Sequence, residues 1–236
     1  MRVLIIGGMH GNEPLGVEIV KCLQQQPIKN VDAVLANEPA IAQDCRFVGV
    51  DLNRSFPGSS ASKEYEQRRA DELLKLCGTY DVVLDFHNTH CPGNDCGFVG
   101  ETANQRLYDI SAWLGLKRII VADYDCINKY APNCLSVEIS LDSSRMSIES
   151  WLKRISEFAS LKALPQAIDV EKFRFVYRMT IEDRDNLKLS DKNLRAFEPI
   201  GERLATAMGV YSPAYPIFVA DAYTPYNYGG LLNKLN

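Results

Sequence analysis

Short apolar runs alternate with amphipathic stretches along the first two thirds of the chain. Runs of this length are typical of buried strands, and apolar residues at helical spacing among charged ones are typical of surface helices. The expected strands are residues 3–6, 31–36, 81–86, 118–122 and 135–139. The expected helices are residues 14–25, 63–76, 103–114 and 148–161. This alternation predicts an α/β fold with a mainly parallel sheet that is covered by helices on both faces.

The pattern changes after Pro165. Residues 172–181 alternate as in a strand, residues 183–186 are typical of a turn, and the tail that follows is rich in proline and tyrosine. We therefore predict two domains, a larger one over residues 1–164 and a small β-rich one over residues 165–236.

Composition and charge narrow the classes of protein. The 236 residues carry a net charge of -4 and no run of Lys or Arg, which argues against a nucleic-acid partner. The N-terminal apolar run is too short for a signal peptide, and no segment approaches the ~20 apolar residues that span a bilayer. The seven cysteines are an odd number without a C-x-x-C pair, which favours reduced thiols. We expect a cytoplasmic protein without a membrane partner.

Two of the three histidines follow predicted strands directly. His10 and Glu13 come after the first strand, and His87 follows the strand 81–86. Loops beyond the carboxyl ends of strands are where open α/β sheets form their sites. Two imidazoles and one carboxylate are the ligands of many catalytic zinc sites, which keep a fourth position for water. The sequence therefore predicts one metal site.

Glu138 is a lone carboxylate inside the apolar run 135–140. Such a group is costly to bury without a partner, so it is a candidate general base beside the metal. The alternative is an edge strand whose Glu138 faces solvent. Both interpretations remain open from the pattern alone.

A third group of polar residues lies within residues 45–56. Arg46 and Arg54 flank a short apolar stretch, and Asn53 is next to Arg54. Guanidinium groups bind carboxylates in a bidentate manner and stabilise developing oxyanions. Arginines in a loop are also commonly surface residues.

Two rival sites have weaker support. The glycine-rich residues 7–11 match neither the P-loop pattern nor G-x-G-x-x-G, so nucleotide binding is disfavoured. His87, His90, Cys91 and Cys96 offer ligand types for a structural metal site, but an adjacent His-Cys pair suits one tetrahedral ion poorly.

Four motifs occur in a fixed order: GGMHGNE, VDLNRSF, LDFHNT and SVEIS. With them the chain resembles the aspartoacylase and succinylglutamate desuccinylase family, and the asparagine after the histidine in DFHNT resembles the aspartoacylase branch. The resemblance implies a zinc-carboxypeptidase-like fold, with a mixed, mainly parallel sheet and a small β-rich C-terminal domain. It also implies hydrolysis of an N-acyl amino acid, a small molecule, to a carboxylate and a free amino acid.

The resemblance further implies a role for individual residues. One Zn²⁺ per chain would be held by His10, Glu13 and His87. Glu138 would be the general base, and Arg46 would stabilise the oxyanion of the attacked amide.

Substrate-binding residues are implied in the same way. Asn53 and Arg54 would hold a carboxylate of the substrate, and Tyr124 and Tyr223 would line its pocket. In aspartoacylases an arginine ten residues before the general base reads the side-chain carboxylate. Here that position is Asn128, and Lys129 next to it supplies charge without the bidentate fork. This difference argues against N-acetylaspartate as the substrate.

Several alternatives stay open. They are a desuccinylase-like enzyme, a carboxypeptidase-type hydrolase, and a carboxylate-binding module that has kept the fold without catalysis. Assembly into a homo-oligomer is also possible.

Overall fold

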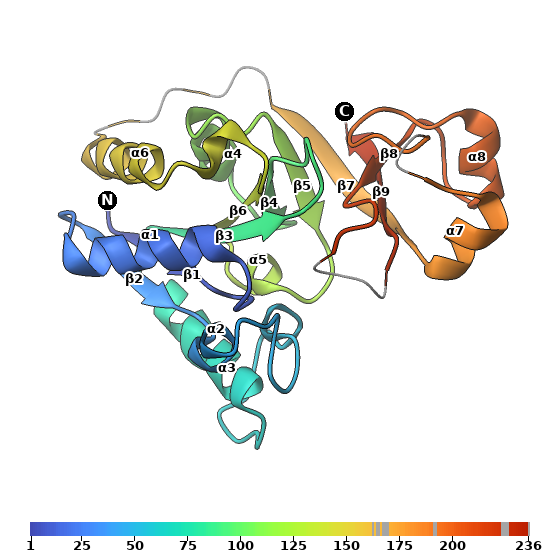
Figure 1. The fold of residues 1–236 in the computed structure, drawn as a ribbon. Helices are drawn as coiled ribbons and strands as arrows, with labels where there is room; N and C mark the ends of the chain where they lie inside the picture. Colours follow the sequence, from blue (N-terminus) through green and yellow to red (C-terminus); the bar gives the residue numbers. More distant parts are fainter. Residues whose placement is uncertain (162, 164–165, 167–169, 191–192, 223–226, 236) are drawn as a thin grey trace.

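Nine strands form a single sheet in the computed structural model, which describes residues 1–161, 163, 166, 170–190, 193–222 and 227–235. The strands are β1 (Val3–Gly7), β2 (Val31–Leu35), β3 (Val82–Thr89), β4 (Cys96–Gly100), β5 (Arg118–Ala122), β6 (Cys134–Ser140), β7 (Glu171–Met179), β8 (Ala214–Ile217) and β9 (Gly229–Leu235). Their order across the sheet is β2-β1-β3-β6-β4-β5-β7-β9-β8 (Figure 1).

The pairing of the strands is mixed. β2, β1, β3 and β6 are parallel neighbours, β4 is antiparallel to β6, and β5 and β7 continue in parallel with β4. β9 is antiparallel to β7, and β8 is antiparallel to β9 and forms the edge of the sheet. Every residue of β1 and β3 is buried, as expected for strands covered on both faces. The predicted mixed, mainly parallel sheet flanked by helices is confirmed.

Helices cover both faces of the sheet. The helices are α1 (Pro14–Gln25), α2 (Glu38–Ala42), α3 (Tyr65–Cys77), α4 (Gln105–Trp113), α5 (Ile127–Tyr130), α6 (Ile148–Ser160), α7 (Ile181–Leu187) and α8 (Glu202–Ala207), with short 3-10 turns η1 (Leu52–Arg54) and η2 (Ser144–Met146). One apolar core joins α1, α4 and α6 to one face of β1 and β3. A second core joins α3, η1 and α5 to the other face, because successive strand residues point to opposite sides.

The C-terminal part extends the same sheet. β7 pairs with β5 of the N-terminal part, while α7 and α8 lie beside β8 and β9 at the other end of the molecule (Figure 1). A separate apolar core, which includes Met179 and Leu231, packs beneath these elements. The division into domains at residues 164 and 165 stays a prediction.

The turn predicted over residues 183–186 is wrong, since they belong to α7. The cause is a capping box: Thr180 Oγ1 accepts the Asp183 amide, and the Asp183 carboxylate accepts the Thr180 amide. This local signal starts a helix where polar composition alone indicates a turn.

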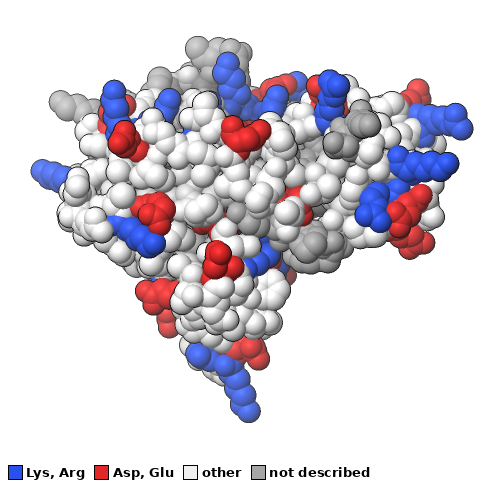
Figure 2. All heavy atoms as spheres, in the orientation of Figure 1, with Lys and Arg blue, Asp and Glu red and all other residues white. Residues whose placement is uncertain are grey.

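The surface and the helices bear on the predicted partners. On the face shown in Figure 2, acidic and basic side chains are interspersed, and the described residues form no extended patch of one sign. Among the described helices, none combines the length and the apolar character that a bilayer crossing requires.

Candidate active site

The turn between β1 and α1 depends on glycine. Gly8 has a φ of 71°, a left-handed conformation that glycine adopts without strain. At Gly7 a Cβ atom would lie 2.1 Å from the carbonyl oxygen of Gly16, so the helix packs directly against the strand end. Pro14 then opens α1 with a φ suited to the first helical turn. The segment from His10 to Glu13 is thereby held at the carboxyl end of β1.

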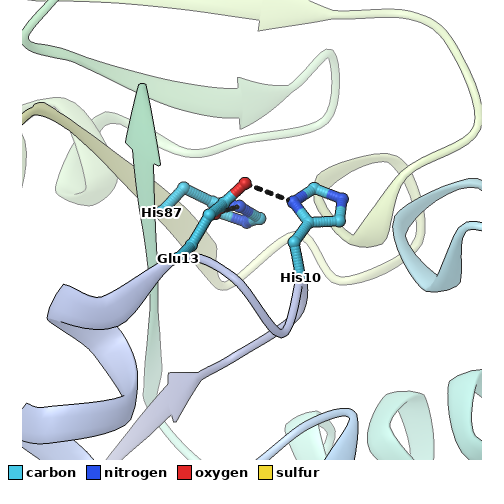
Figure 3. A group of neighbouring side chains, drawn as sticks. All are labelled: His10, Glu13 and His87. Atoms are coloured by element: carbon cyan, nitrogen blue, oxygen red, sulfur yellow. Dashed lines mark hydrogen bonds and ion pairs between the residues drawn. The ribbon is translucent and has the colours of Figure 1, made fainter. Parts of the chain in front are cut away.

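Three buried side chains converge above this strand end (Figure 3). Glu13 lies between the two imidazoles: His10 Nδ1 is 2.6 Å from Glu13 Oε1, and His87 Nδ1 is 2.9 Å from Glu13 Oε2. Their potential ligand atoms all lie within 4.8 Å of one another, and the residues are only 2–4% exposed. The structure therefore brings together the three predicted metal ligands.

Each imidazole is backed by a second carboxylate. His10 Nε2 is 3.2 Å from Asp51 Oδ1, and His87 Nε2 is 2.7 Å from Asp85 Oδ2. Metal-ligating histidines commonly use their outer nitrogen in this way, which fixes the ring and raises its basicity. Two Nδ1 atoms and one carboxylate, each oriented from behind, suit a divalent metal ion.

The imidazoles and carboxylates of the cluster shift the pKa values of Glu13 and His87 towards their charged forms. Burial alone would raise the pKa of Glu13, but the charges of His10 and His87 hold it well below its usual range. Burial alone would lower the pKa of His87, but the carboxylates of Asp85 and Glu13 raise it well above its usual value. A metal ion would take the place of the protons that these groups share.

The Asp85→Asn variant is expected to bind metal about 10- to 100-fold more weakly than the wild-type protein, because an amide orients His87 without making it more basic. Competition with a fluorescent chelator measures this affinity. Asp185→Asn, an exposed change on α7, is the matched control and should have no effect. Equal affinity of the Asp85→Asn and wild-type proteins would contradict the supporting role of Asp85.

Glu138 lies on a central strand. β6 is flanked by β3 and β4, and Glu138 is paired in register with His87 on one side and Cys96 on the other. The alternative of an edge strand with a solvent-facing Glu138 is therefore wrong. Burial raises the pKa of Glu138 well above its usual range, and the carboxylates of Glu13 and Asp221 act in the same direction.

The segment with the two arginines is anchored by a buried carboxylate. Glu66 of α3 accepts hydrogen bonds from the amides of Val48 and Gly49 through Oε1, at 3.1 and 3.0 Å. The loop thus directs Arg46 inward, where Nη1 is 3.4 Å from Glu13 Oε1 and Nη2 is 3.4 Å from Asp51 Oδ2. Arg46 is therefore a cation at the edge of the cluster.

Asn53 and Arg54 occupy η1 at the other end of this segment. Asn53 Oδ1 accepts the Ile127 amide at 3.3 Å, which ties η1 to α5. The Arg54 guanidinium lies 4.8 Å from the ring centre of Tyr124, a cation–π arrangement. These contacts place a second cation and its aromatic partner beside the cluster of His10, Glu13 and His87.

The candidate metal ligands, Glu138, both arginines, Asn53 and Tyr124 face one cavity. It is lined by His10, Glu13, Arg46, Asn53, Arg54, His87, Asn88, Phe98, Tyr124, Cys126, Asn128, Ser136, Glu138, Phe218 and Asp221. The metal ligands, Glu138, Arg46, Asn53, Arg54 and Tyr124 were all singled out from the sequence.

Lys129 is a predicted site residue, but its side chain points away from the cavity. Its Nζ is 2.8 Å from Asp125 Oδ1, and its side chain is 42% exposed. One step along α5 rotates the side chain by about 100°, so Asn128 faces the cavity and Lys129 faces solvent. Tyr223, the other predicted pocket residue, lies outside the described residues.

The proposed structural metal site at His87, His90, Cys91 and Cys96 has no support. Among the described residues, only His10, Glu13 and His87 bring three potential ligands together. His90 is exposed and is not among the residues that line the cavity.

Several residues in or behind the cavity were not predicted from the sequence. Asp85 carries a weak signal, because it stands two residues before His87 and so shares its face of β3. Phe98 and Phe218 carry no sequence signal, because only the tertiary fold brings β4 and the segment after β8 to one place.

Comparisons with known proteins agree with this geometry. Residues 1–99 match the model of the succinylglutamate desuccinylase/aspartoacylase catalytic domain. N-acyl-aromatic-L-amino acid amidohydrolase (carboxylate-forming) of Mus musculus is 42% identical over 107 residues, which are 38% of this chain and 34% of that protein. Aspartoacylase of Rattus norvegicus is 36% identical over 106 residues, or 37% and 34% of the two chains. The matched part thus spans about a third of these relatives.

Solved structures resemble the whole chain. Succinylglutamate desuccinylase of Chromobacterium violaceum superposes with a TM-score of 0.74 at 19% identity, covering 100% of this chain and 85% of the other. Murine aminoacylase 3 gives 0.72 at 24% identity, covering 100% and 95%. At these identities the likeness establishes the fold.

Proposed function

We propose that the protein is a zinc-dependent amidohydrolase, because its first 99 residues match the model of the succinylglutamate desuccinylase/aspartoacylase catalytic domain. It cleaves an N-acyl amino acid to a carboxylate and a free amino acid. The observation that carries this proposal is the single cavity that joins the His10, Glu13 and His87 cluster to Glu138 and to two arginines. The free state of all seven cysteines is in keeping with a cytoplasmic enzyme.

The cluster supplies the ligands for one zinc ion, which when bound polarises the amide carbonyl and acidifies a water molecule. Glu138 accepts the proton of the attacking water on its carboxylate and donates it to the leaving nitrogen. Burial favours the protonated form of Glu138, so its carboxyl group can hold this proton between the two steps.

The arginines divide two further tasks. Arg46 lies against Glu13 and Asp51, so its charge is next to the position where the oxyanion develops. Arg54, with Asn53 beside it, binds the α-carboxylate of the substrate and fixes the scissile amide near the metal cluster. Its stacking on Tyr124 limits the positions that the guanidinium can adopt.

A desuccinylase is less well supported by the cavity. A succinyl group carries a further carboxylate, whereas Arg46 and Arg54 are the only Lys or Arg residues among the described residues that line the cavity. An acyl group without charge therefore fits the cavity better than a succinyl group.

A hydrolysis screen tests the proposal. The zinc-loaded protein is incubated with acetyl- and succinyl-amino acids, and release of the free amine is measured. We expect turnover of acetyl-amino acids and weaker turnover of succinyl-amino acids. If acetyl-amino acids bound with no hydrolysis of any substrate, the protein would be a carboxylate-binding module and the proposal would be wrong.

A further inference from the structure

Two phenyl rings form a wall of the cavity that has no part in the chemistry described above. Phe98 of β4 and Phe218, which follows β8, both line the cavity. Their ring centres are 6.0 Å apart and their planes differ by 14°, a stacked arrangement. They come from segments that are 120 residues apart in the chain, so the wall exists only in the folded protein.

The backbone at this wall is strained. Phe218 has a φ of 53° and Ala220 a φ of 56°, in the left-handed region that residues with a side chain rarely adopt. Such conformations persist where the surrounding structure enforces them, and they are common at binding sites.

Asn94 is the residue that enforces the position of Phe218. Its Oδ1 accepts the Phe218 amide at 2.9 Å, and its Nδ2 donates to the carbonyl oxygens of Cys91 and Pro92 at 3.1 and 2.9 Å. Asn94 is 2% exposed, so this amide is fixed by the loop after β3.

The end of β3 and the loop after it hold the residues that follow Phe218. Cys91 Sγ donates to the Val219 carbonyl at 3.2 Å, and Thr89 Oγ1 donates to the Asp221 carboxylate. The Phe218 ring is thus held in place before any ligand enters, which lowers the entropic cost of binding.

The side-chain amide of Asn128, which lies beside this wall, makes all of its hydrogen bonds within the protein. Asn128 Nδ2 donates to the carbonyl oxygens of Phe98 and Cys134 at 3.0 and 3.3 Å, and its Oδ1 accepts the Ser136 hydroxyl at 3.0 Å. Asn128 therefore offers no donor to a carboxylate on the side chain of a substrate.

The wall adjoins the group that holds the α-carboxylate. Tyr124, on which Arg54 stacks, packs in the same apolar cluster as Phe98 and Phe218. In an amino acid the side chain and the carboxylate leave the same carbon atom. A substrate held at Arg54 thus places its side chain close to these rings.

We propose that Phe218, stacked on Phe98 and positioned by Asn94, determines specificity for the amino-acid side chain, and that this subsite takes apolar side chains. The inference rests on the proposed function, because it assumes that an N-acyl amino acid occupies the cavity. Beyond that function, it states that the wall recognises the amino-acid side chain of the substrate, and it names the residues responsible.

The test compares substrates that differ only in the side chain. In the Phe218→Ala variant, kcat/KM for N-acetyl-phenylalanine and N-acetyl-leucine is expected to fall about 10- to 100-fold, while kcat/KM for N-acetyl-glycine changes by less than about 3-fold. Asn94→Ala should raise KM for N-acetyl-phenylalanine more than it changes kcat. Tyr211→Ala, which removes an exposed aromatic ring of the same segment, is the matched control and should leave all values unchanged.

Two results would overturn the inference. One is an equal loss for N-acetyl-phenylalanine and N-acetyl-glycine in the folded variant, since a merely structural role predicts that result. The other is a loss in Phe218→Ala that follows the length of the acyl chain and not the side chain. Failure of the wild-type protein to hydrolyse any of these substrates is a separate result, and it would refute the proposed function itself.

Discussion

The Glu138→Gln variant is expected to hydrolyse N-acyl amino acids about 10²- to 10⁴-fold more slowly than the wild-type protein, while its affinity for metal is unchanged. The amide has the size of the carboxyl group but cannot accept a proton from water or return it to the leaving nitrogen. Glu138 is on β6, beside His87 in register but not within the metal cluster, so the ligands stay in place. Amine release and the metal content of the purified protein measure the two effects.

Glu149→Gln is a suitable control, because it makes the same chemical change at an exposed position in the first turn of α6. Its turnover should equal that of the wild-type protein. Unchanged turnover of Glu138→Gln would remove Glu138 from the mechanism, and loss of the metal would show that it acts as a ligand.

Removal of the metal is expected to abolish hydrolysis and to lower the melting temperature by about 10 °C when the protein is compared with a sample at a zinc concentration about 1,000-fold above the dissociation constant. The physical reason is linkage, because the folded protein brings together His10, Glu13 and His87, whereas the unfolded chain does not. Without the ion, Glu13 and Asp85 stay buried and their charge is balanced by the imidazoles and, at Glu13, by Arg46. Differential scanning calorimetry with and without a chelator measures the shift.

Two histidine variants separate the metal centre from nonspecific binding. His87→Ala should melt at the same temperature with and without the chelator, because it has lost one ligand. His90→Ala, which changes an exposed histidine three residues away, should respond like the wild-type protein. A response to the chelator that persists in His87→Ala would place the metal elsewhere.

The strands and the metal ligands were predictable from the sequence for local reasons. Buried parallel strands are continuous apolar runs, so β1 and β5 stand out, and polar residues shortly after such a run fall at the edge of the sheet where sites form. His10, Glu13 and His87 satisfy that rule. Glu138 was found because a carboxylate within an apolar strand requires an explanation, and its central position in the sheet supplies one.

The remaining features depend on contacts between distant segments. β4 contains two glycines in five residues and lies antiparallel to β6, so no alternating or continuous apolar pattern marks it. Whether Asn128 or Lys129 faces the cavity depends on the rotation of the four-residue helix α5, which a sequence pattern this short does not fix. The pairing of Asp51 with His10 joins residues 41 positions apart and needs the folded loop.

We propose that the buried cluster of His10, Glu13 and His87 is the metal centre of an N-acyl amino acid hydrolase. A titration of the metal-free protein with zinc, followed by amine release from N-acetyl-amino acids, tests it most directly. We predict that activity rises linearly and reaches a plateau at one equivalent of zinc per chain, and that His10→Ala shows no such rise. Activity that is full without metal, or a plateau that His10→Ala also reaches, would contradict the claim.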